Sequence, residues 1–145
     1  MKFDTEKLES FKQAIKAKED EYKSFGKQLF KDYIKEYFKT YPEIQAVVFA
    51  AYTPYFNDGD TCEYGIHDPV YVLEGFDPQN ILRHYDYEDE EQFKIADYSH
   101  SNYKDYKEFN KFMQQNTELM KVIFGDHVCV YITPEEIITE EYEHD

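Results

Sequence analysis

The sequence predicts a single α+β domain, in which N-terminal helices pack on an antiparallel β-sheet that contains a hairpin. Three observations support this fold class. Residues 3–40 repeat apolar side chains at helical spacing, residues 44–52 form an apolar run typical of a buried strand, and turn-forming residues follow that run. We expect four segments: helical (1–41), β-hairpin or meander (44–73), irregular and acidic (74–101), and a further helix with one or more C-terminal strands and an acidic tail (102–145).

The helical segment is predicted from one stripe of apolar residues, which recur every three to five positions: Phe3, Leu8, Phe11, Ile15, Tyr22, Phe25, Leu29, Tyr33, Tyr37 and Phe38. Asp4 or Thr5 is placed to cap its start. Whether the segment is one long helix or two depends on residues 18–22, where we expect a break. Gly26 is expected to loosen or bend the helix. Pro42 ends it, because the residue before a proline resists the helical conformation.

The sheet is predicted to begin at residues 44–52, whose apolar, β-branched and aromatic composition suits a buried central strand. Residues 57–60 supply a turn, since Gly, Asn and Asp tolerate positive φ, and residues 62–66 return as the second strand of a hairpin. Pro69 is expected to enter a third strand over residues 69–73. Residues 74–101 contain no predicted element, and the like charges of 85–91 are typical of a solvated loop or helix start.

The C-terminal segment is predicted as a helix over residues 103–124, followed by a strand over 128–132. The apolar face of the helix consists of Tyr106, Phe109, Phe112, Met113, Leu119, Met120 and Ile123. Gly125 is expected to end the helix. After residue 132 two alternatives are open: Ile137 and Ile138 start a last strand, or Pro134 opens a short helix.

The negative charge is concentrated in the last hundred residues. Of the net charge of −15, residues 1–45 contribute +1 from ten lysines and nine acids, and residues 46–145 contribute −16 from six basic and twenty-two acidic residues. This excess disfavours direct binding to nucleic acid and favours a basic partner or metal cations. No apolar run approaches the ~20 residues of a membrane span. The start of the chain lacks the apolar stretch of a signal peptide, so we expect a cytoplasmic protein that does not contact membranes.

Motifs of the common enzyme classes are missing from the sequence. It contains no nucleophile elbow, no phosphate-binding loop, no zinc-protease motif and no dinucleotide fingerprint. Cys62 and Cys129 form neither a disulfide framework nor a metal motif, and we expect both to be buried thiols in strands. The sequence therefore favours a non-enzymatic protein without a cofactor.

Carboxylates cluster beside tyrosines in the hairpin turn, in the 86–91 run and in the C-terminal tail. We predict that a partner binds to Asp58, Asp60, Glu63, Tyr85, Asp86, Tyr87, Glu88, Asp89, Glu90 and Glu91. Because DNA carries one negative charge per about 1.7 Å of axis, rows of carboxylates on a rigid protein can occupy a site shaped for DNA. Tyrosines would anchor the contact. The expected partner is a basic, nucleic-acid-binding protein such as a nuclease. In the alternative interpretation, acidity only keeps a Tyr-rich domain soluble.

A divalent metal site, in a metal-binding protein or a metal-dependent enzyme, is the second functional class. Hard cations take six to eight oxygen ligands, and residues 57–63 contain suitable side chains, although the spacing of an EF-hand is absent. Gly59 stands where a hairpin turn would place it. Histidine and carboxylate side chains also bind zinc or manganese. The candidates of this kind are scattered rather than spaced as a motif: His67, Asp68, Asp126, His127, His144 and Asp145.

Residues 52–64, YTPYFNDGDTCEY, resemble a family of uncharacterised small proteins from bacteria and their phages that carries a YTPYFNDGDxCxF-like segment. Residues 125–128 (GDHV) and 140–145 (EEYEHD) are similar to two late segments of the same family. The resemblance implies no catalytic role. It implies that the hairpin and the C-terminal tail meet in space, which would gather one candidate metal site from Asp58, Asp60, His127, His144 and Asp145.

Overall fold

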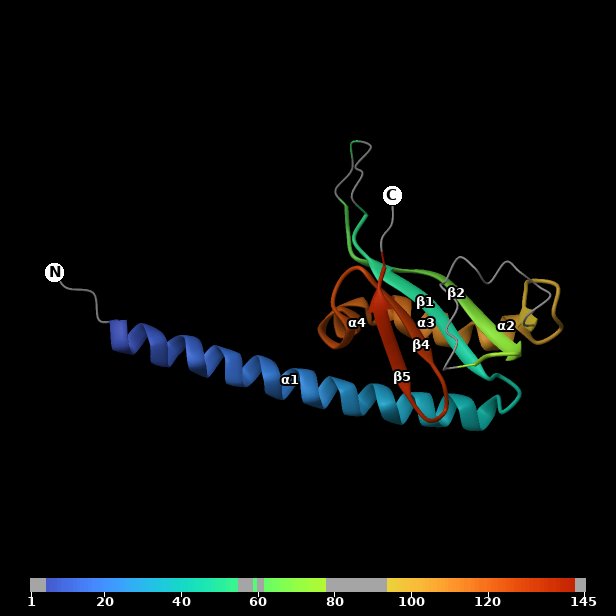
Figure 1. Ribbon diagram of the computed structural model, residues 1–145, viewed down its shortest axis with the longest axis horizontal. Helices are drawn as coiled ribbons and strands as arrows, with labels where there is room; N and C mark the ends of the chain where they lie inside the picture. Colours follow the sequence, from blue (N-terminus) through green and yellow to red (C-terminus); the bar gives the residue numbers. More distant parts are fainter. Residues whose placement is uncertain (1–4, 55–58, 60–61, 78–93, 143–145) are drawn as a thin grey trace.

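An antiparallel sheet with the strand order β3-β2-β1-β4-β5 forms the centre of the computed structural model (Figure 1). The structure describes residues 5–54, 59, 62–77 and 94–142. Within them the strands are β1 (Ala46–Tyr52), β2 (Gly65–Glu74), β3 (Lys94–Ala96), β4 (Val128–Ile132) and β5 (Ile137–Glu141). The helices are α1 (Thr5–Thr40), α2 (Tyr103–Tyr106), α3 (Glu108–Gln115) and α4 (Thr117–Phe124). The predicted α+β class, with helices on an antiparallel sheet, is confirmed.

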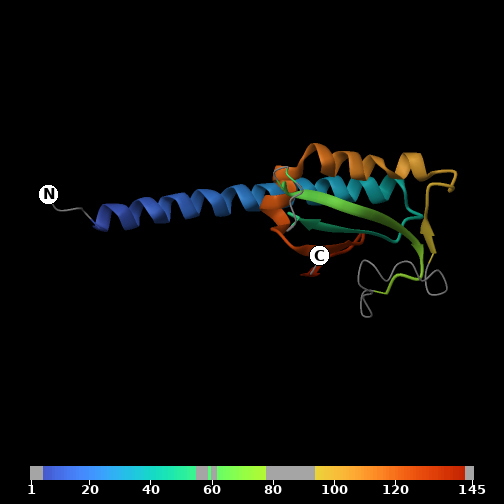
Figure 2. The ribbon, with the colours of Figure 1, turned by 90° about the horizontal axis from the view of Figure 1, so that it is seen from above.

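The helices lie on one face of the sheet, and the main hydrophobic core fills the space between them (Figure 2). Phe30 of α1 and Phe109 of α3 contact each other edge to face there, above Phe49 and Val130 of the central strands. Because side chains alternate along a strand, the opposite face carries a second, smaller core. Its buried members are Ala46, Val48, Val72, Cys129 and Tyr131.

Strand β1 is the central strand that the sequence predicts, since residues 46–51 are buried. It pairs with β2 on one side and β4 on the other, and the β1–β2 hairpin is confirmed. The separate strand predicted from Pro69 is wrong, because β2 runs unbroken from Gly65 to Glu74. Pro69 lies beside an irregularity in the β1–β2 ladder and outside the pairing with β3, so its missing N–H is tolerated. Cys62 precedes β2 instead of lying in it, whereas Cys129 is buried in β4.

Helix α1 is continuous over 36 residues, so the break predicted at residues 18–22 is wrong. That stretch contains no Gly or Pro, and Lys18 lies 3.5 Å from Glu21 one turn later. Gly26 lies inside the continuous helix, buried against α4: a Cβ at this position would be 2.8 Å from Cδ1 of Leu119. The buried residues of α1 begin at Gly26, and the preceding part projects beyond the sheet (Figure 1).

The single helix predicted over residues 103–124 is instead three short helices, separated at Lys107 and Asn116. Asn116 leaves the helical conformation (φ −130°, ψ 42°), and its side-chain amide donates a hydrogen bond of 2.8 Å to the carbonyl of Phe112. The predicted apolar face is nonetheless buried at five positions: Tyr106, Phe109, Met113, Met120 and Ile123.

The remaining C-terminal predictions are largely confirmed. Gly125 ends α4 with a positive φ of 78°, and β4 covers the predicted residues. Of the two alternatives after residue 132, the strand is the one formed, as β5. Strand β3 falls in the segment where no regular element is predicted. None of the helices in the described ranges is long and apolar enough to cross a membrane.

Candidate functional site

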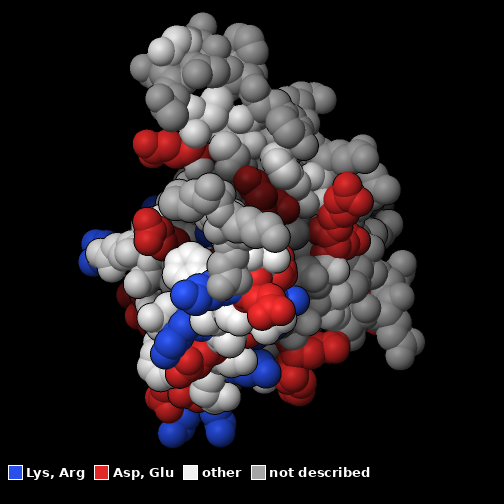
Figure 3. Space-filling model, turned by 90° about the vertical axis from the view of Figure 1, so that its left-hand side faces the viewer, with Lys and Arg blue, Asp and Glu red and all other residues white. Residues whose placement is uncertain are grey.

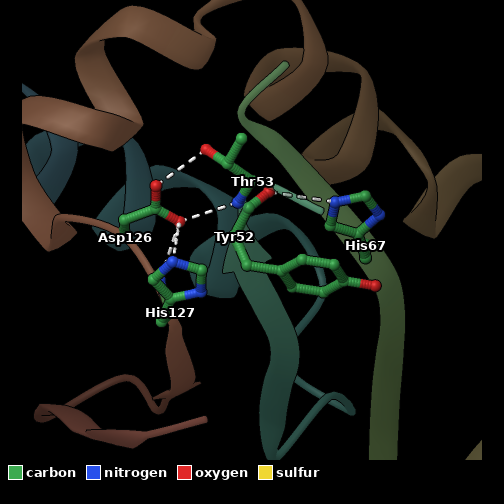
Figure 4. Close-up of polar contacts among 5 residues, drawn as sticks. All are labelled: Tyr52, Thr53, His67, Asp126 and His127. Atoms are coloured by element: carbon green, nitrogen blue, oxygen red, sulfur yellow. Dashed lines mark hydrogen bonds and ion pairs between the residues drawn. The ribbon is translucent and has the colours of Figure 1, made fainter. Parts of the chain in front are cut away.

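Residues 54–64, which we call the acidic hairpin segment, connect β1 to β2. The end of the sheet from which they leave, which we call the hairpin rim, is formed by Tyr52, Thr53, His67, Asp126 and His127 (Figure 4). Tyr52 ends β1, and His67 lies near the start of β2. Asp126 and His127 belong to the turn between α4 and β4. Antiparallel pairing brings these elements together, since Tyr52 lies opposite Gly65 and Ala51 opposite Val128.

Asp126 joins the α4–β4 turn to the hairpin. Its two carboxylate oxygens accept hydrogen bonds of 2.7 Å from the backbone N–H and from the hydroxyl of Thr53 (Figure 4). The backbone N–H of His127 donates a third hydrogen bond of 2.9 Å to the same carboxylate. His127 has a φ of 55°, a conformation that residues other than glycine seldom adopt. A tight turn therefore directs the carboxylate at the first residue after β1.

The hydrogen bonds also decide the protonation of Asp126. Burial alone would raise its pKa, but the hydrogen bonds from Thr53 and His127 outweigh burial and hold the pKa of this carboxyl below its usual value. The His127 ring nitrogen Nε2 lies 3.6 Å from the carboxylate and adds to this effect when protonated. Asp126 is thus a carboxylate engaged by three donors. This arrangement suits an anchor that holds the hairpin better than a group that delivers a proton.

Aromatic rings cover the other side of the rim. The ring of His67 stacks on Tyr52 with centroids 3.9 Å apart, and its Nε2 lies 3.3 Å from the Tyr52 carbonyl oxygen. Tyr142, the last described residue, contacts Tyr52 with ring centroids 5.5 Å apart. Its N–H donates to the carbonyl of His127. The described end of the C-terminal tail therefore lies against the hairpin rim.

The structure describes one of the ten predicted partner-binding residues. Glu63 is exposed just before β2. Gly59 is exposed, with a φ of 98° as expected at the predicted turn. The other nine lie outside the described residues: Asp58, Asp60, Tyr85, Asp86, Tyr87, Glu88, Asp89, Glu90 and Glu91.

Of the five predicted metal ligands, His127 lies on the hairpin rim beside Asp126. The other four lie outside the described residues: Asp58, Asp60, His144 and Asp145. Among the residues that the structure describes, no group of three or more His, Cys, Asp and Glu side chains could hold a metal ion. His67 stacks on Tyr52 instead of facing Asp126 (Figure 4).

Charge is unevenly distributed between α1 and the rest of the molecule. The two ion pairs that join a described lysine to a described carboxylate, Lys12–Glu9 and Lys18–Glu21, both lie on α1. Lysines and carboxylates are interleaved over this helix when the molecule is viewed from its projecting end (Figure 3). Beyond α1, exposed carboxylates such as Glu63 and Glu118 add to the charge of −16 over residues 46–145.

A groove of about 440 Å³ separates α1 from the turn between β4 and β5. Lys31 and Lys35 line it from the helix, and Glu135 and Glu136 line it from the turn. Because both signs of charge face the same space, the groove favours neither an anion nor a cation. The hairpin rim is therefore the stronger candidate for a functional surface.

Sequence reasoning missed the contact between Thr53 and Asp126, which are 73 residues apart. A usable signal was present, because Asp126 directly follows the helix-ending Gly125, where a side chain is free to bond a neighbouring strand end. Comparisons of the chain with models of protein families, with curated proteins and with solved structures find no match. The resemblance to the bacterial and phage family stays a prediction.

Proposed function

We propose that this is a non-enzymatic interaction protein, whose acidic surface binds a basic, nucleic-acid-binding protein by mimicking the charge of DNA. The observation that supports the proposal most is the segregation of charge. Residues 46–145 carry −16, and the described lysine–carboxylate ion pairs lie on α1, away from that excess. Six basic residues cannot neutralise the twenty-two acids of this part of the chain, so the field of the excess carboxylates stays available to a basic partner.

The hairpin rim supports the proposal because it fixes both strands that lead into the acidic hairpin segment. Thr53 is held by Asp126 on one side, and His67 stacks on Tyr52 on the other. A segment held at both ends loses less conformational entropy when a partner binds. Glu63 is exposed beside this anchor. The exposed carboxylate of Glu63 therefore lies at the rim end of the sheet.

A second acid–tyrosine pair lies between β3 and α2, outside the residues predicted from the sequence. Tyr98 is 88% exposed. Its neighbour Asp97 accepts hydrogen bonds from the hydroxyl and the N–H of Ser99, which hold the pKa of the carboxyl below its usual value. An ionised carboxylate beside an exposed tyrosine combines charge attraction with an aromatic anchor, as the proposed binding mode requires.

The proposal is tested by capturing a partner on the immobilised full-length protein and measuring its affinity for two matched variants. Asp60→Asn/Glu63→Gln removes two carboxylates of the hairpin segment. Glu135→Gln/Glu136→Gln removes two exposed carboxylates from the β4–β5 turn, at the opposite end of the sheet. We expect the first variant to weaken binding about ten-fold and the second to change it little. Salt screens exposed charges that are more than a Debye length of about 8 Å apart, so only carboxylates close to the bound partner contribute to its affinity. Equal effects of the two variants would contradict the proposal.

A metal site is the second candidate function, and the contacts among Tyr52, His127 and Tyr142 support it. His127 and Tyr142 share a backbone hydrogen bond, and Tyr142 contacts Tyr52, so the described end of the tail lies beside His127, the one predicted ligand that the structure describes. A site-specific ion at 100 times its dissociation constant would stabilise the fold by about 2.7 kcal/mol. Thermal unfolding with Ca²⁺, Mg²⁺, Mn²⁺ and Zn²⁺, each against chelator, tests this. A shift with one ion that His127→Ala abolishes would favour the metal site, whereas equal small shifts would indicate charge screening.

A further inference from the structure

The projecting part of α1 exposes a stripe of large apolar side chains. Residues 5–25 include no buried side chain, and this part of the helix extends away from the sheet (Figure 1). The exposed fractions of the side chains in the stripe are high: Phe11 64%, Ile15 43%, Tyr22 67%, Phe25 67% and Leu29 50%. In proteins most of the stability of a helix comes from packing an amphipathic face, and this part of α1 packs on no described element. Such a continuous apolar stripe marks an interaction surface.

The stripe has the spacing of a coiled coil. With heptad positions lettered a to g, the a positions are Leu8, Ile15, Tyr22 and Leu29, and the d positions are Phe11, Lys18 and Phe25. Six of these seven positions are apolar, and Lys18 is the exception. Alternating steps of three and four residues over three heptads are typical of a helix that packs along its length against another helix.

The stripe is distinct from the face by which α1 packs on the body. That packing face contains Gly26, Phe30 and Ile34. At 3.6 residues per turn, its centre lies about a quarter of a turn from the centre of the a/d stripe. The body can therefore hold the C-terminal part of α1 while the stripe remains open to a second helix.

We propose that a second copy of this chain occupies the stripe, in an antiparallel two-helix coiled coil. The flanking charges select the orientation. A parallel pair would place Lys7 (g) beside Lys12 (e) of the second copy, and Lys18 opposite Lys18. An antiparallel pair that sets Leu8 opposite Phe25 instead brings Lys12 beside Glu19 of the second copy, twice by symmetry.

The same register accommodates the rest of the molecule. It sets Lys18 opposite Ile15 of the second copy, where the long aliphatic stem can pack while the ammonium group reaches water. It sets Thr5 opposite Gln28, two residues after Gly26, where the buried residues of α1 begin, so the helices overlap over about 24 residues or about 36 Å. The two bodies then stand at opposite ends of the coiled coil. A parallel dimer would hold two regions of charge −16 side by side.

Sedimentation equilibrium of the full-length protein at micromolar concentrations tests the self-association. We expect a dimer for the wild type and a monomer for Phe11→Asp/Phe25→Asp, which places two charges in the seam. Gln13→Asp/Ser24→Asp adds the same charges to the exposed opposite side of the helix and is expected to remain dimeric. A monomeric wild type, or equal loss of dimer in both variants, would overturn the proposal.

Charge reversal tests the orientation independently. In the antiparallel dimer the Lys12→Glu substitution places a carboxylate beside Glu19 of the second copy. Because the two carboxylates repel each other, we expect the dissociation constant of the dimer to rise about ten-fold. The double variant Lys12→Glu/Glu19→Lys should restore the wild-type value. In a parallel dimer Lys12→Glu would remove a repulsion with Lys7 and tighten the dimer, and that result would overturn the antiparallel arrangement. The stripe on α1 and the acidic hairpin segment share no residue. The dimerisation results would therefore stay the same if the hairpin segment failed to bind a partner.

Discussion

At the scale of single residues, the contact between Asp126 and Thr53 is the clearest link between fold and site. Two residues far apart in sequence meet where β1 ends, and the hydrogen bonds between them hold Thr53, the first residue after the strand. A partly buried acceptor engaged by three donors is costly to remove, because the donors then lose a charged partner. The hairpin rim therefore contributes to the stability of the fold as well as holding the residue at which the chain leaves β1.

We expect Asp126→Asn to lower the free energy of unfolding by about 1–3 kcal/mol at neutral pH. Because the pKa of Asp126 is lowered in the folded state, its contribution is fully present above the unfolded value near 4 and is lost as the pH falls through the folded value. The stability gap between wild type and variant should therefore narrow in acid. Urea unfolding at several pH values measures it.

The control for this prediction is Glu136→Gln, which removes an exposed carboxylate from the β4–β5 turn. Exposed surface substitutions of this kind change stability by about 0.5 kcal/mol or less. A gap between wild type and Asp126→Asn that stays constant from neutral to acid pH would show that the carboxylate charge does not hold the hairpin rim.

At the scale of elements, Gly26 of α1 packs closely against Leu119 of α4. A Cβ at residue 26 would lie 2.8 Å from the end of the Leu119 side chain, so the glycine permits the two helices to approach. We expect Gly26→Leu to lower the free energy of unfolding by about 1–3 kcal/mol, because overpacking separates the helices. Thermal or urea unfolding measures the change.

Gly26→Ala is the matched variant for this contact. The end of a leucine side chain can shift to admit one methyl group, and alanine gains up to about 1 kcal/mol of helix propensity over glycine. We therefore expect Gly26→Ala to be close to neutral. If the alanine variant is destabilised as much as the leucine variant, Gly26 has another role, such as a bend in α1.

Elements defined by local patterns could be predicted from the sequence, whereas those decided by tertiary contacts could not. The apolar run of β1 and the stop at Gly125 are local, and both predictions are confirmed. The division of residues 103–124 depends on Asn116, whose side chain competes for a backbone carbonyl. Strand β3 has three residues and depends on its pairing with β2. The contact between Asp126 and Thr53 spans 73 residues, so the local signal at Gly125 and Asp126 does not identify the residue that Asp126 binds.

At the scale of the whole molecule, the chain separates two kinds of surface. α1 carries nine of the fifteen lysines and an apolar stripe, and residues 46–145 carry the excess negative charge. This separation allows self-association through α1 without covering the hairpin rim. An antiparallel dimer would display two acidic surfaces at opposite ends, and two sites on one particle raise the apparent affinity for a partner with two matching sites.

The dependence of partner affinity on salt tests the central claim most directly. For a captured partner, purified and titrated with the full-length protein, charge mimicry predicts an affinity that falls about ten-fold or more between low and high NaCl concentration. The Glu135→Gln/Glu136→Gln variant should follow the wild type, and Asp60→Asn/Glu63→Gln should show a shallower dependence on salt. An affinity that does not change with NaCl would contradict charge mimicry as the function of this acidic surface.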